Sequence, residues 1–419
     1  MNYSQRDAAA IWHPYTQHFR SPEFPVIKRA EGNYFYLDDG TRVLDAISSW
    51  WVNLHGHSHP AILERISRTM ADLQQVMFAG FTHPDAVCLA ERILGLFGGR
   101  YSKAFFSDNG STSVEVALKM CFQYWSNQGS ERKKIVAFKN SYHGDTFGAM
   151  SIAERSVFSR PFWPFLFEVE FVAPENPEEL VEVLSRYPEE VAGLIYEPLV
   201  QGAGGMRFHG PELLDQSLAL AKKAGILLIA DEVMTGFGRT GELFASFHLE
   251  HQPDIVCLSK GLTGGVLPLG LTLSTEAIYR AFQDEDRNKT LFHGHSFTGN
   301  ALSCSAALAS LELLLREDCK EKIRWLERMH RDFSSHLRTL VAPIRDVRSL
   351  GTILAVDFET ERSGYLSDLG LAMQKFFMDR GILLRPLGNT LYVLPPYSFG
   401  AAEVDRTYSS IETFIRSQF

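Results

Sequence analysis

The middle of the chain alternates short apolar runs with helical stretches, and this pattern constrains the fold most strongly. The apolar runs are flanked by turn residues and are typical of buried strands; they are 134–138, 191–196, 225–230, 255–258 and 269–273. Helical stretches, such as 114–125 and 211–224, adjoin several of these runs. Strands that alternate with helices predict an α/β layer built on a mostly parallel sheet.

The end of the chain has a different pattern, which predicts a smaller α+β unit. Its expected elements are a helix over 304–315, a strand over 353–358, a helix near 370–380 and a strand over 391–394. Because a chain of 419 residues is too long for one ordinary core, we expect two domains. Chain ends often meet in space. We therefore expect 1–50 and 313–419 to form the small domain, and 51–312 to form the large one.

The composition excludes several classes of protein. The formal net charge is −9 and no run of Lys and Arg stands out, so a nucleic-acid binder is not expected. The N-terminus lacks an apolar signal core, and apolar runs such as 226–230 are too short to cross a bilayer. The five cysteines are scattered, with no C-x-x-C pair. This pattern favours reduced thiols in a cytosolic enzyme over disulfides or a zinc site.

Two of the expected strands end in residues that carry chemistry. The run 225–230 leads directly into Asp231 and Glu232, and 253–258 leads into Ser259, Lys260 and Gly261. Taken singly, the acid could be an exposed turn and the lysine a surface residue. Together, they can face one ligand at the carboxyl edge of the sheet. In pyridoxal chemistry a lysine condenses with the aldehyde and a carboxylate pairs with the pyridinium nitrogen. The displaced lysine can then move a proton.

The segment 105–113 could hold the phosphate of such a cofactor. Gly110 and Ser111 lie at the expected start of a helix, where free N–H groups and hydroxyls bind anions. Thr112 with Glu115 fits a capping box, so an ordinary capped helix is the alternative. Tyr142, just past a strand, could stack on a planar ring or lie exposed in a turn. The segment 292–300, rich in glycines and hydroxyls, is a second possible phosphate contact.

Two other motifs point to rival classes. The glycines of 236–241 match G-x-G-x-x-G, but a dinucleotide fingerprint needs them directly between a strand and a helix, and 231–235 intervene. The histidines of 55–59 suggest a metal hydrolase, but no cluster of carboxylates accompanies them and Pro60 indicates a turn. We therefore expect neither a nicotinamide oxidoreductase nor a metal site.

The segment Asp231-Glu232-Val233, the glycines of 236–241 and Ser259-Lys260-Gly261 together resemble the signature of class III aminotransferases. These are pyridoxal-phosphate enzymes of fold type I, and the resemblance covers nearly the whole chain. It implies a large α/β domain plus a smaller α+β domain formed by both chain ends. It also implies that Lys260 forms the Schiff base with the cofactor and that Asp231 pairs with the pyridine nitrogen.

The same resemblance implies further contacts and a homodimer. Gly110 and Ser111 would bind the phosphate, and Tyr142 would stack on the ring. Each active site would be built from two subunits, with Gly294 contacting substrate and with His295 and Ser296 reaching the phosphate of the neighbouring chain. Some members carry Pro-Thr in place of His295-Ser296. Serine keeps the hydroxyl, whereas the histidine could alter the pocket.

Four segments, 11–16, 48–51, 142–150 and 201–206, resemble the biotin-pathway branch of this family, which converts 8-amino-7-oxononanoate to 7,8-diaminononanoate. This narrower resemblance implies that Tyr15, also a catalytic candidate, and Trp50 and Trp51 line the substrate pocket. Arg385 would bind the substrate carboxylate, which suits a guanidinium fork. Without the resemblance, the alternatives are a pair of core tryptophans and a surface ion pair for Arg385. S-adenosylmethionine is the expected amino donor, although some related enzymes use lysine. The nearer rival is another ω-aminotransferase, acting on ornithine, γ-aminobutyrate or a diamine.

Overall fold

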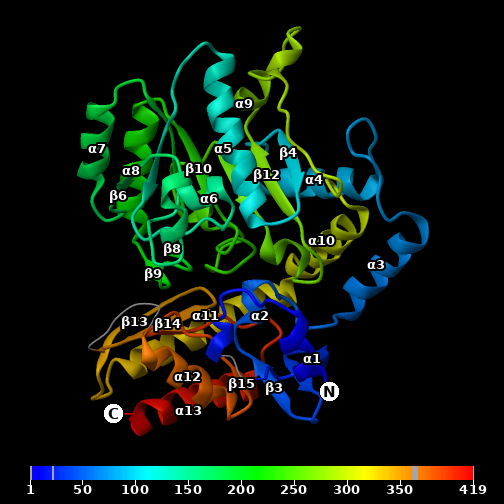
Figure 1. Cartoon of the computed structure of the whole chain (residues 1–419), viewed down its shortest axis with the longest axis vertical. Coiled ribbons are helices and arrows are strands. Elements are labelled where there is room, and N and C mark those ends of the chain that lie inside the picture. The colour runs from blue at the N-terminus through cyan, green and yellow to red at the C-terminus, as the bar shows by residue number, and fades with distance from the viewer. Residues whose placement is uncertain (1, 21–22, 361–366, 419) are drawn as a thin grey trace.

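The chain forms two lobes in the computed structural model, which describes residues 2–20, 23–360 and 367–418 (Figure 1). The larger lobe contains a seven-stranded sheet in the order β4-β12-β11-β10-β7-β5-β6. Its strands are β4 (Lys103–Ser107), β5 (Lys134–Phe138), β6 (Val169–Val172), β7 (Val191–Tyr196), β10 (Leu227–Asp231), β11 (Ile255–Leu258) and β12 (Gly270–Ser274).

Five adjacent strands of this sheet run parallel: β11, β10, β7, β5 and β6. Strand β12 is antiparallel to both its neighbours, β11 and β4. The prediction of a mostly parallel sheet is therefore confirmed. Every residue of β7, β10, β11 and β12 is buried, as expected for strands covered on both faces. The run that we placed at 225–230 begins at Leu227 and includes Asp231 as its last residue, so the acid belongs to the strand itself.

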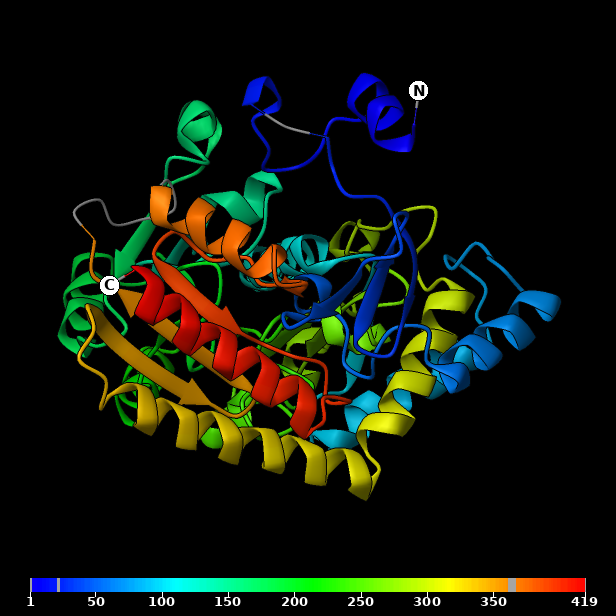
Figure 2. The ribbon, with the colours of Figure 1, turned by 90° about the horizontal axis from the view of Figure 1, so that it is seen from below.

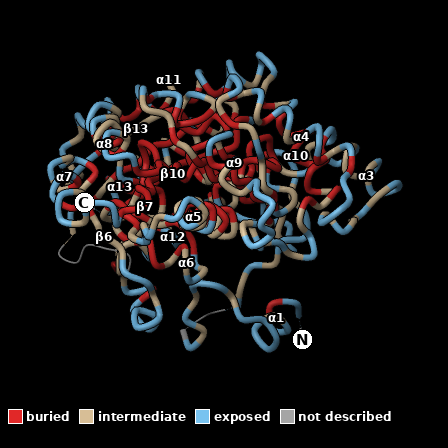
Figure 3. Tube along the Cα trace, turned by 90° about the horizontal axis from the view of Figure 1, so that it is seen from above, coloured by how far each residue is buried: buried red, intermediate tan, exposed pale blue. Residues whose placement is uncertain are grey.

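Helices and short turns cover the sheet and connect its strands, and the buried residues gather between these layers (Figure 3). The helices of this part are α3 (Pro60–Asp72), α4 (Pro84–Leu96), α5 (Gly110–Asn127), α6 (Phe147–Ser151), α7 (Pro177–Arg186), α8 (Pro211–Lys223), α9 (Glu276–Arg280) and α10 (Ala301–Leu314). Short 3-10 turns of this lobe occupy Arg160–Phe165, Ala245–His248, Lys260–Thr263 and Arg287–Lys289, and another, His18–Arg20, lies in the N-terminal segment. A two-stranded ribbon pairs β8 (Val200–Gln201) with β9 (Arg207–Phe208).

The smaller lobe joins both ends of the chain (Figure 2). One sheet contains β1 (Ile27–Glu31), β2 (Tyr34–Leu37), β3 (Arg42–Asp45) and β15 (Ile382–Leu383), and the other contains β13 (Ile344–Leu350), β14 (Ile353–Phe358) and β16 (Thr390–Val393). Its helices are α1 (Tyr3–Ala10), α2 (Ser48–Trp51), α11 (Glu317–Leu337), α12 (Asp368–Met378) and α13 (Ala401–Gln418). The parallel pairing of β3 with β15 joins the two ends of the chain in one sheet, and the division into 1–50, 51–312 and 313–419 stays a prediction.

The described helices include none that is long and apolar enough to span a membrane.

Candidate active site

Two cavities meet around Lys260, at the carboxyl edge of the large sheet. One, of about 600 Å³, is lined by the start of α5 and by the ends of β10 and β11; the other, of about 630 Å³, extends toward the small lobe. Trp51, Tyr142 and Lys260 line both. The structure thus brings together side chains that are more than 200 positions apart in the sequence. We call the two spaces the inner and the outer cavity.

Asp231 and a buried histidine form a pair in the inner cavity. Asp231 is 5% exposed, and its Oδ2 lies 2.7 Å from Nδ1 of His143, whose side chain is fully buried. The backbone N–H of Val233 donates to Oδ1 of Asp231 at 3.0 Å. These two contacts fix the orientation of the carboxyl group at the end of β10. The sequence did not lead us to predict a role for His143, although it directly follows Tyr142.

Lys260 follows β11 in a left-handed backbone conformation, with φ of 46°. Burial lowers the pKa of its amino group from 10.5 to about 8, although the nearby Asp231 and Glu197 act to raise it. Its Nζ lies 4.6 Å from the centroid of the Trp51 ring. A lysine with such a pKa is partly the neutral amine near neutral pH, and this neutral form is the one that attacks a carbonyl.

The start of α5 is built as an anion cradle. Gly110 and Ser111 lie in the first turn, where backbone N–H groups have no acceptor within the helix. A Cβ on Gly110 would lie 2.6 Å from Cγ1 of Val233, and one on Gly144 would lie 2.1 Å from Oγ of Ser111. Side chains at these two glycines would therefore clash with the walls of the cradle.

The expected capping box between Thr112 and Glu115 is wrong. The N-cap is Asn109, whose side chain accepts from the N–H of Thr112 at 2.9 Å, while Oγ1 of Thr112 accepts from the N–H of Asn109 at 3.2 Å. The capping box lies three positions earlier because Asn109 already supplies the acceptor. Glu115 instead accepts from the hydroxyl of Thr146 and from the N–H of Gly148.

Glu197 is a second functional residue that the sequence reasoning missed. Its carboxyl group accepts from the N–H of Tyr142 at 3.0 Å and from that of Gly202 at 2.8 Å, so it holds the segment that presents the tyrosine. Burial raises the pKa of this carboxyl group to about 7. Glu197 directly follows β7, just as Asp231 ends β10. The signal that identified Asp231, an acid at the end of a buried strand, would also have identified Glu197.

Tyr15, Trp50 and Arg385 meet in the outer cavity, although they come from distant parts of the chain. The hydroxyl of Tyr15 donates to Asp145 and lies 3.4 Å from that of Tyr142. Trp50 is 41% exposed, and the guanidinium carbon of Arg385 lies 4.9 Å from its ring centroid. Within the part of the chain that the structure describes, Arg385 has no ion pair with a carboxylate. The surface ion pair that was the alternative for this arginine is therefore not seen.

The second tryptophan has a different environment from the first. Trp51 is only 4% exposed, and its indole N–H donates to the hydroxyl of Tyr392 at 3.0 Å. It belongs partly to the core and partly to the walls of both cavities, so the core alternative holds in part for this tryptophan.

Three predicted contacts lie apart from these cavities in the same chain. Gly294, His295 and Ser296 are not among the described residues that line either cavity. The resemblance assigned them to the site of a neighbouring chain, and this assignment stays a prediction.

The rival motifs have other roles. No helix directly follows the glycines of 236–241; the next element is the short 3-10 turn Ala245–His248, so the dinucleotide geometry is absent there. Glu232 is fully buried and accepts from the N–H groups of Ala245 and Ser246, which ties down this loop. His55 and His57 contact separate partners, the hydroxyl of Ser310 and the carboxyl group of Asp45.

The residues of the inner cavity fit pyridoxal phosphate. The cradle at Gly110 and Ser111 suits the phosphate, and the ring of Tyr142 offers a flat apolar surface. Asp231 and Lys260 line the same cavity and can meet the ring nitrogen and the aldehyde carbon. The cavity combines N–H donors for an anion, one carboxyl group and one amino group. These groups match the phosphate, the ring nitrogen and the aldehyde of the cofactor, so the site indicates this class of cofactor.

The fold and this site define a pyridoxal-phosphate enzyme of fold type I. The family described as aminotransferase class-III matches residues 16–415, so the chain belongs to the class III aminotransferases, whose cofactor is pyridoxal phosphate. The chain is 47% identical to the adenosylmethionine-8-amino-7-oxononanoate aminotransferase of Synechococcus elongatus, over 96% of this chain and 97% of that one. It is 36% identical to the enzyme of the same name from Helicobacter pylori, over 98% and 97%.

Two solved structures show the same fold over nearly the whole chain. An adenosylmethionine-8-amino-7-oxononanoate aminotransferase from Methanocaldococcus jannaschii has a TM-score of 0.93 at 35% identity, with 98% of each chain covered. An amine transaminase from an uncultivated Pseudomonas species, in a form with pyridoxal phosphate bound, has a TM-score of 0.91 at 29% identity, with 97% of this chain and 98% of that one covered. The backbone is thus shared across substrates, and the outer cavity has to distinguish them.

Proposed function

We propose that this enzyme transfers an amino group to the ketone of 8-amino-7-oxononanoate and forms 7,8-diaminononanoate, a step of biotin biosynthesis. S-adenosylmethionine is the proposed donor. The observation that carries the proposal is the outer cavity, which is lined by Lys260, Tyr15, Trp50 and Arg385. The ring of Trp50 lies between Tyr15 and Arg385 and contacts both. A substrate with a ketone, an alkyl chain and a remote carboxylate fits that order of groups. The similarity to the adenosylmethionine-8-amino-7-oxononanoate aminotransferases supports the same substrate.

When bound, pyridoxal phosphate supplies a ring that takes up the electron pair released at the substrate carbon and carries the amino group between the two halves of the reaction. Asp231 would pair with the ring nitrogen, and its contact with His143 holds the carboxyl group in one orientation. Lys260 would move the proton at the amine-bearing carbon, for which a pKa near 8 is well suited. Gly110 and Ser111 would hold the phosphate through their N–H groups.

The residues of the outer cavity orient the keto acid. The guanidinium of Arg385 can hold the carboxylate in two parallel hydrogen bonds, and the ring of Trp50 beneath it offers an apolar surface to the alkyl chain. Trp51 excludes water from the space between Lys260 and the core. The hydroxyl of Tyr15, held by Asp145, lies where it can bind the polar end near the ketone. In each turnover the donor leaves as its keto form and the acceptor leaves as the diamine.

The proposed assembly is a homodimer with shared active sites. Large aromatic side chains are highly exposed in this single chain: Trp12 at 90%, Phe19 at 93%, Phe292 at 71% and Phe297 at 61%. The N-terminal segment with α1 stands away from the body of the molecule (Figure 2). Exposed aromatic surface of this kind favours a partner. We propose that a second copy covers it and that Gly294, His295 and Ser296 complete the neighbouring site.

The proposed location is the cytosol. All five cysteines are free thiols in the structure, which suits a reducing compartment.

The test is to supply 8-amino-7-oxononanoate to the yellow holoenzyme with S-adenosylmethionine or with lysine, and to detect 7,8-diaminononanoate. We expect product with S-adenosylmethionine. Product with lysine alone would change the donor, whereas no product with either would overturn the proposed substrate. In that case ornithine, γ-aminobutyrate and a diamine would be tried, since a general ω-aminotransferase shares Lys260 and Asp231.

A further inference from the structure

The two tryptophans of the outer cavity lie on a segment with an unusual backbone. In α2, Ser48, Ser49 and Trp51 have positive φ values of 54°, 61° and 68°, and Trp50 between Ser49 and Trp51 is also non-helical, with φ of −137° and ψ of 59°. Residues other than glycine rarely adopt positive φ, and three within four positions need surrounding contacts that enforce them. These contacts decide where the two indole rings lie.

Asp45 supplies the most direct of these contacts. Its side chain is fully buried, and the N–H of Ser49 donates to both of its carboxyl oxygens, at 2.8 and 2.7 Å. The N–H of Ile47 donates to Oδ1 at 3.3 Å, and the hydroxyl of Ser49 donates to Oδ2 at 3.3 Å. A buried carboxyl group needs such donors. Because Ser49 has a positive φ, its N–H can point back to Asp45, so the strained conformation and the hydrogen bonds support each other.

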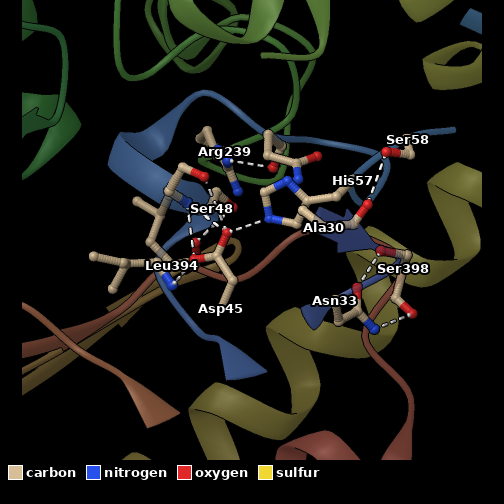
Figure 4. Close-up of polar contacts among 12 residues, drawn as sticks. Ala30, Asn33, Asp45, Ser48, His57, Ser58, Arg239, Leu394 and Ser398 are labelled. Carbon is tan, nitrogen blue, oxygen red and sulfur yellow. Dashed lines mark hydrogen bonds and ion pairs between the residues drawn. The ribbon is translucent and has the colours of Figure 1, made fainter. Parts of the chain in front are cut away.

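His57 closes the segment from its other end. Its Nε2 donates to Oδ2 of Asp45 at 2.8 Å (Figure 4). The centroid of its ring lies 4.5 Å from that of Phe35. Its backbone pairs with Gly32 through two hydrogen bonds, so His57 is itself anchored to the edge of the small lobe. The contact between Asp45 and His57 thus closes a loop, residues 45–57, that carries both tryptophans.

Two further contacts hold the same loop against the rest of the chain. The hydroxyl of Ser48 donates to the carbonyl of Leu394 at 2.8 Å, and the buried guanidinium of Arg239 donates to the carbonyl of Asn53 at 3.3 Å. They anchor Ser48 and Asn53, on either side of the two tryptophans. Among the described residues, only Asp45 accepts a hydrogen bond from the N–H of Ser49, next to Trp50.

We propose that Asp45 and His57 are positioning residues, which hold the loop 45–57 so that Trp50 and Trp51 form the wall of the outer cavity. The inference rests on the proposed function in one respect, namely that substrate occupies this cavity. Without the hydrogen bond from His57, the backbone around Ser49 relaxes toward negative φ. Trp50 then moves away from Arg385, and Trp51 from Lys260. Neither Asp45 nor His57 lines the cavity, so both act through the tryptophans.

The test compares three variants of the holoenzyme. His57→Phe keeps a ring on Phe35 but removes the donor, and His57→Gln replaces it with an amide N–H at a similar reach. The matched control is His330→Phe. His330 lies on helix α11, outside both cavities; it is buried, whereas His57 is partly buried, and its Nδ1 lies 2.7 Å from the hydroxyl of Tyr408.

Two readouts are measured for each protein. Steady-state kinetics give KM for the keto acid and kcat separately, and hydrogen–deuterium exchange gives the protection of a peptide spanning 46–52. Cofactor absorbance reports whether each variant is loaded. For His57→Phe we expect KM to rise about ten- to a hundredfold with a smaller change in kcat, and faster exchange in 46–52. His57→Gln should restore KM and the exchange of 46–52 most of the way to their wild-type values. His330→Phe should change neither KM nor this exchange.

The proposal is overturned if His57→Phe keeps the wild-type KM and the wild-type exchange of 46–52, or if His330→Phe raises KM as much. Asp45→Asn is a further variant, in which an amide N–H would face the N–H of Ser49 or the ring N–H of His57. For this variant we expect a larger rise in KM than for His57→Phe, and faster exchange in 46–52 than in the wild type. If the wild-type enzyme does not turn over the keto acid, the proposed function fails, and the exchange comparison still decides the role of Asp45 and His57.

Discussion

Replacing Lys260 with methionine tests the electrostatic state of the site without any substrate. Lys260 is partly buried where the two cavities meet, and burial lowers the pKa of its amino group to about 8 from the ordinary 10.5. At 1.36 kcal/mol per pH unit, this difference corresponds to about 3 kcal/mol. The charged lysine therefore destabilises the cofactor-free fold, and Lys260→Met should stabilise it by about that amount at pH 7.

The sign of the pH dependence follows from linkage. Between about pH 8 and 10.5 the unfolded chain binds more protons than the folded one, so the stability of the wild-type protein rises with pH in this window. Below pH 8 the protonated amino group of Lys260 lowers the free energy of unfolding by the full amount. The advantage of Lys260→Met should hence be largest at pH 7 and should nearly vanish at pH 10.5.

Thermal unfolding of the cofactor-free proteins at equal concentration measures this difference. A chain of 419 residues has an unfolding entropy of about 0.9 kcal/mol/K, so 3 kcal/mol raises Tm by about 3 °C. The control is Lys375→Met, at an exposed lysine, which should change Tm by less than about 1 °C at either pH. Equal Tm values for wild type and Lys260→Met at pH 7, or a difference that persists at pH 10.5, would refute the reasoning.

Three other predictions concern the cofactor and the substrate. Gly110→Ala places a Cβ 2.6 Å from Cγ1 of Val233, so the cofactor affinity measured by titration should fall about tenfold. An unchanged affinity would show that Val233 can move without loss of the phosphate site. Arg385→Met should raise KM for the keto acid about a hundredfold and Arg385→Lys less, and equal values for wild type and both variants would exclude the carboxylate contact. Asp231→Asn removes a charge that raises the pKa of Lys260, so the pH midpoint for rebinding the cofactor should move down; a move upward would contradict the assigned sign.

The inner cavity was largely predictable from the sequence because its chemistry follows strand ends. Asp231 ends β10 and Lys260 follows β11, and neighbouring parallel strands bring their carboxyl ends together. The same rule applies to Glu197 after β7, which was overlooked only because the rule was not applied to it. His143 could be placed near a strand end, but its contact with Asp231 depends on how a loop folds back, and no local pattern encodes that.

The start of α5 shows where local reasoning reaches its limit. Several residues near a helix start can serve as its N-cap, and Asn109 and Thr112 both fit. The choice depends on competing acceptors, and Glu115 is occupied by Thr146 and Gly148 from another segment. Tertiary contacts therefore decided the capping pattern.

By itself, the sequence determined the α/β layer, and it indicated the class of cofactor and the two strand-end residues proposed to face it, because periodicity and strand ends are local properties. Only the tertiary structure decided the shape of the outer cavity. Trp50 and Trp51 both line this cavity, and they follow serines of α2 that have positive φ values. Such a conformation is unfavourable for serine in isolation, so no propensity predicts it; hydrogen bonds from residues outside α2, such as those to Asp45, support it.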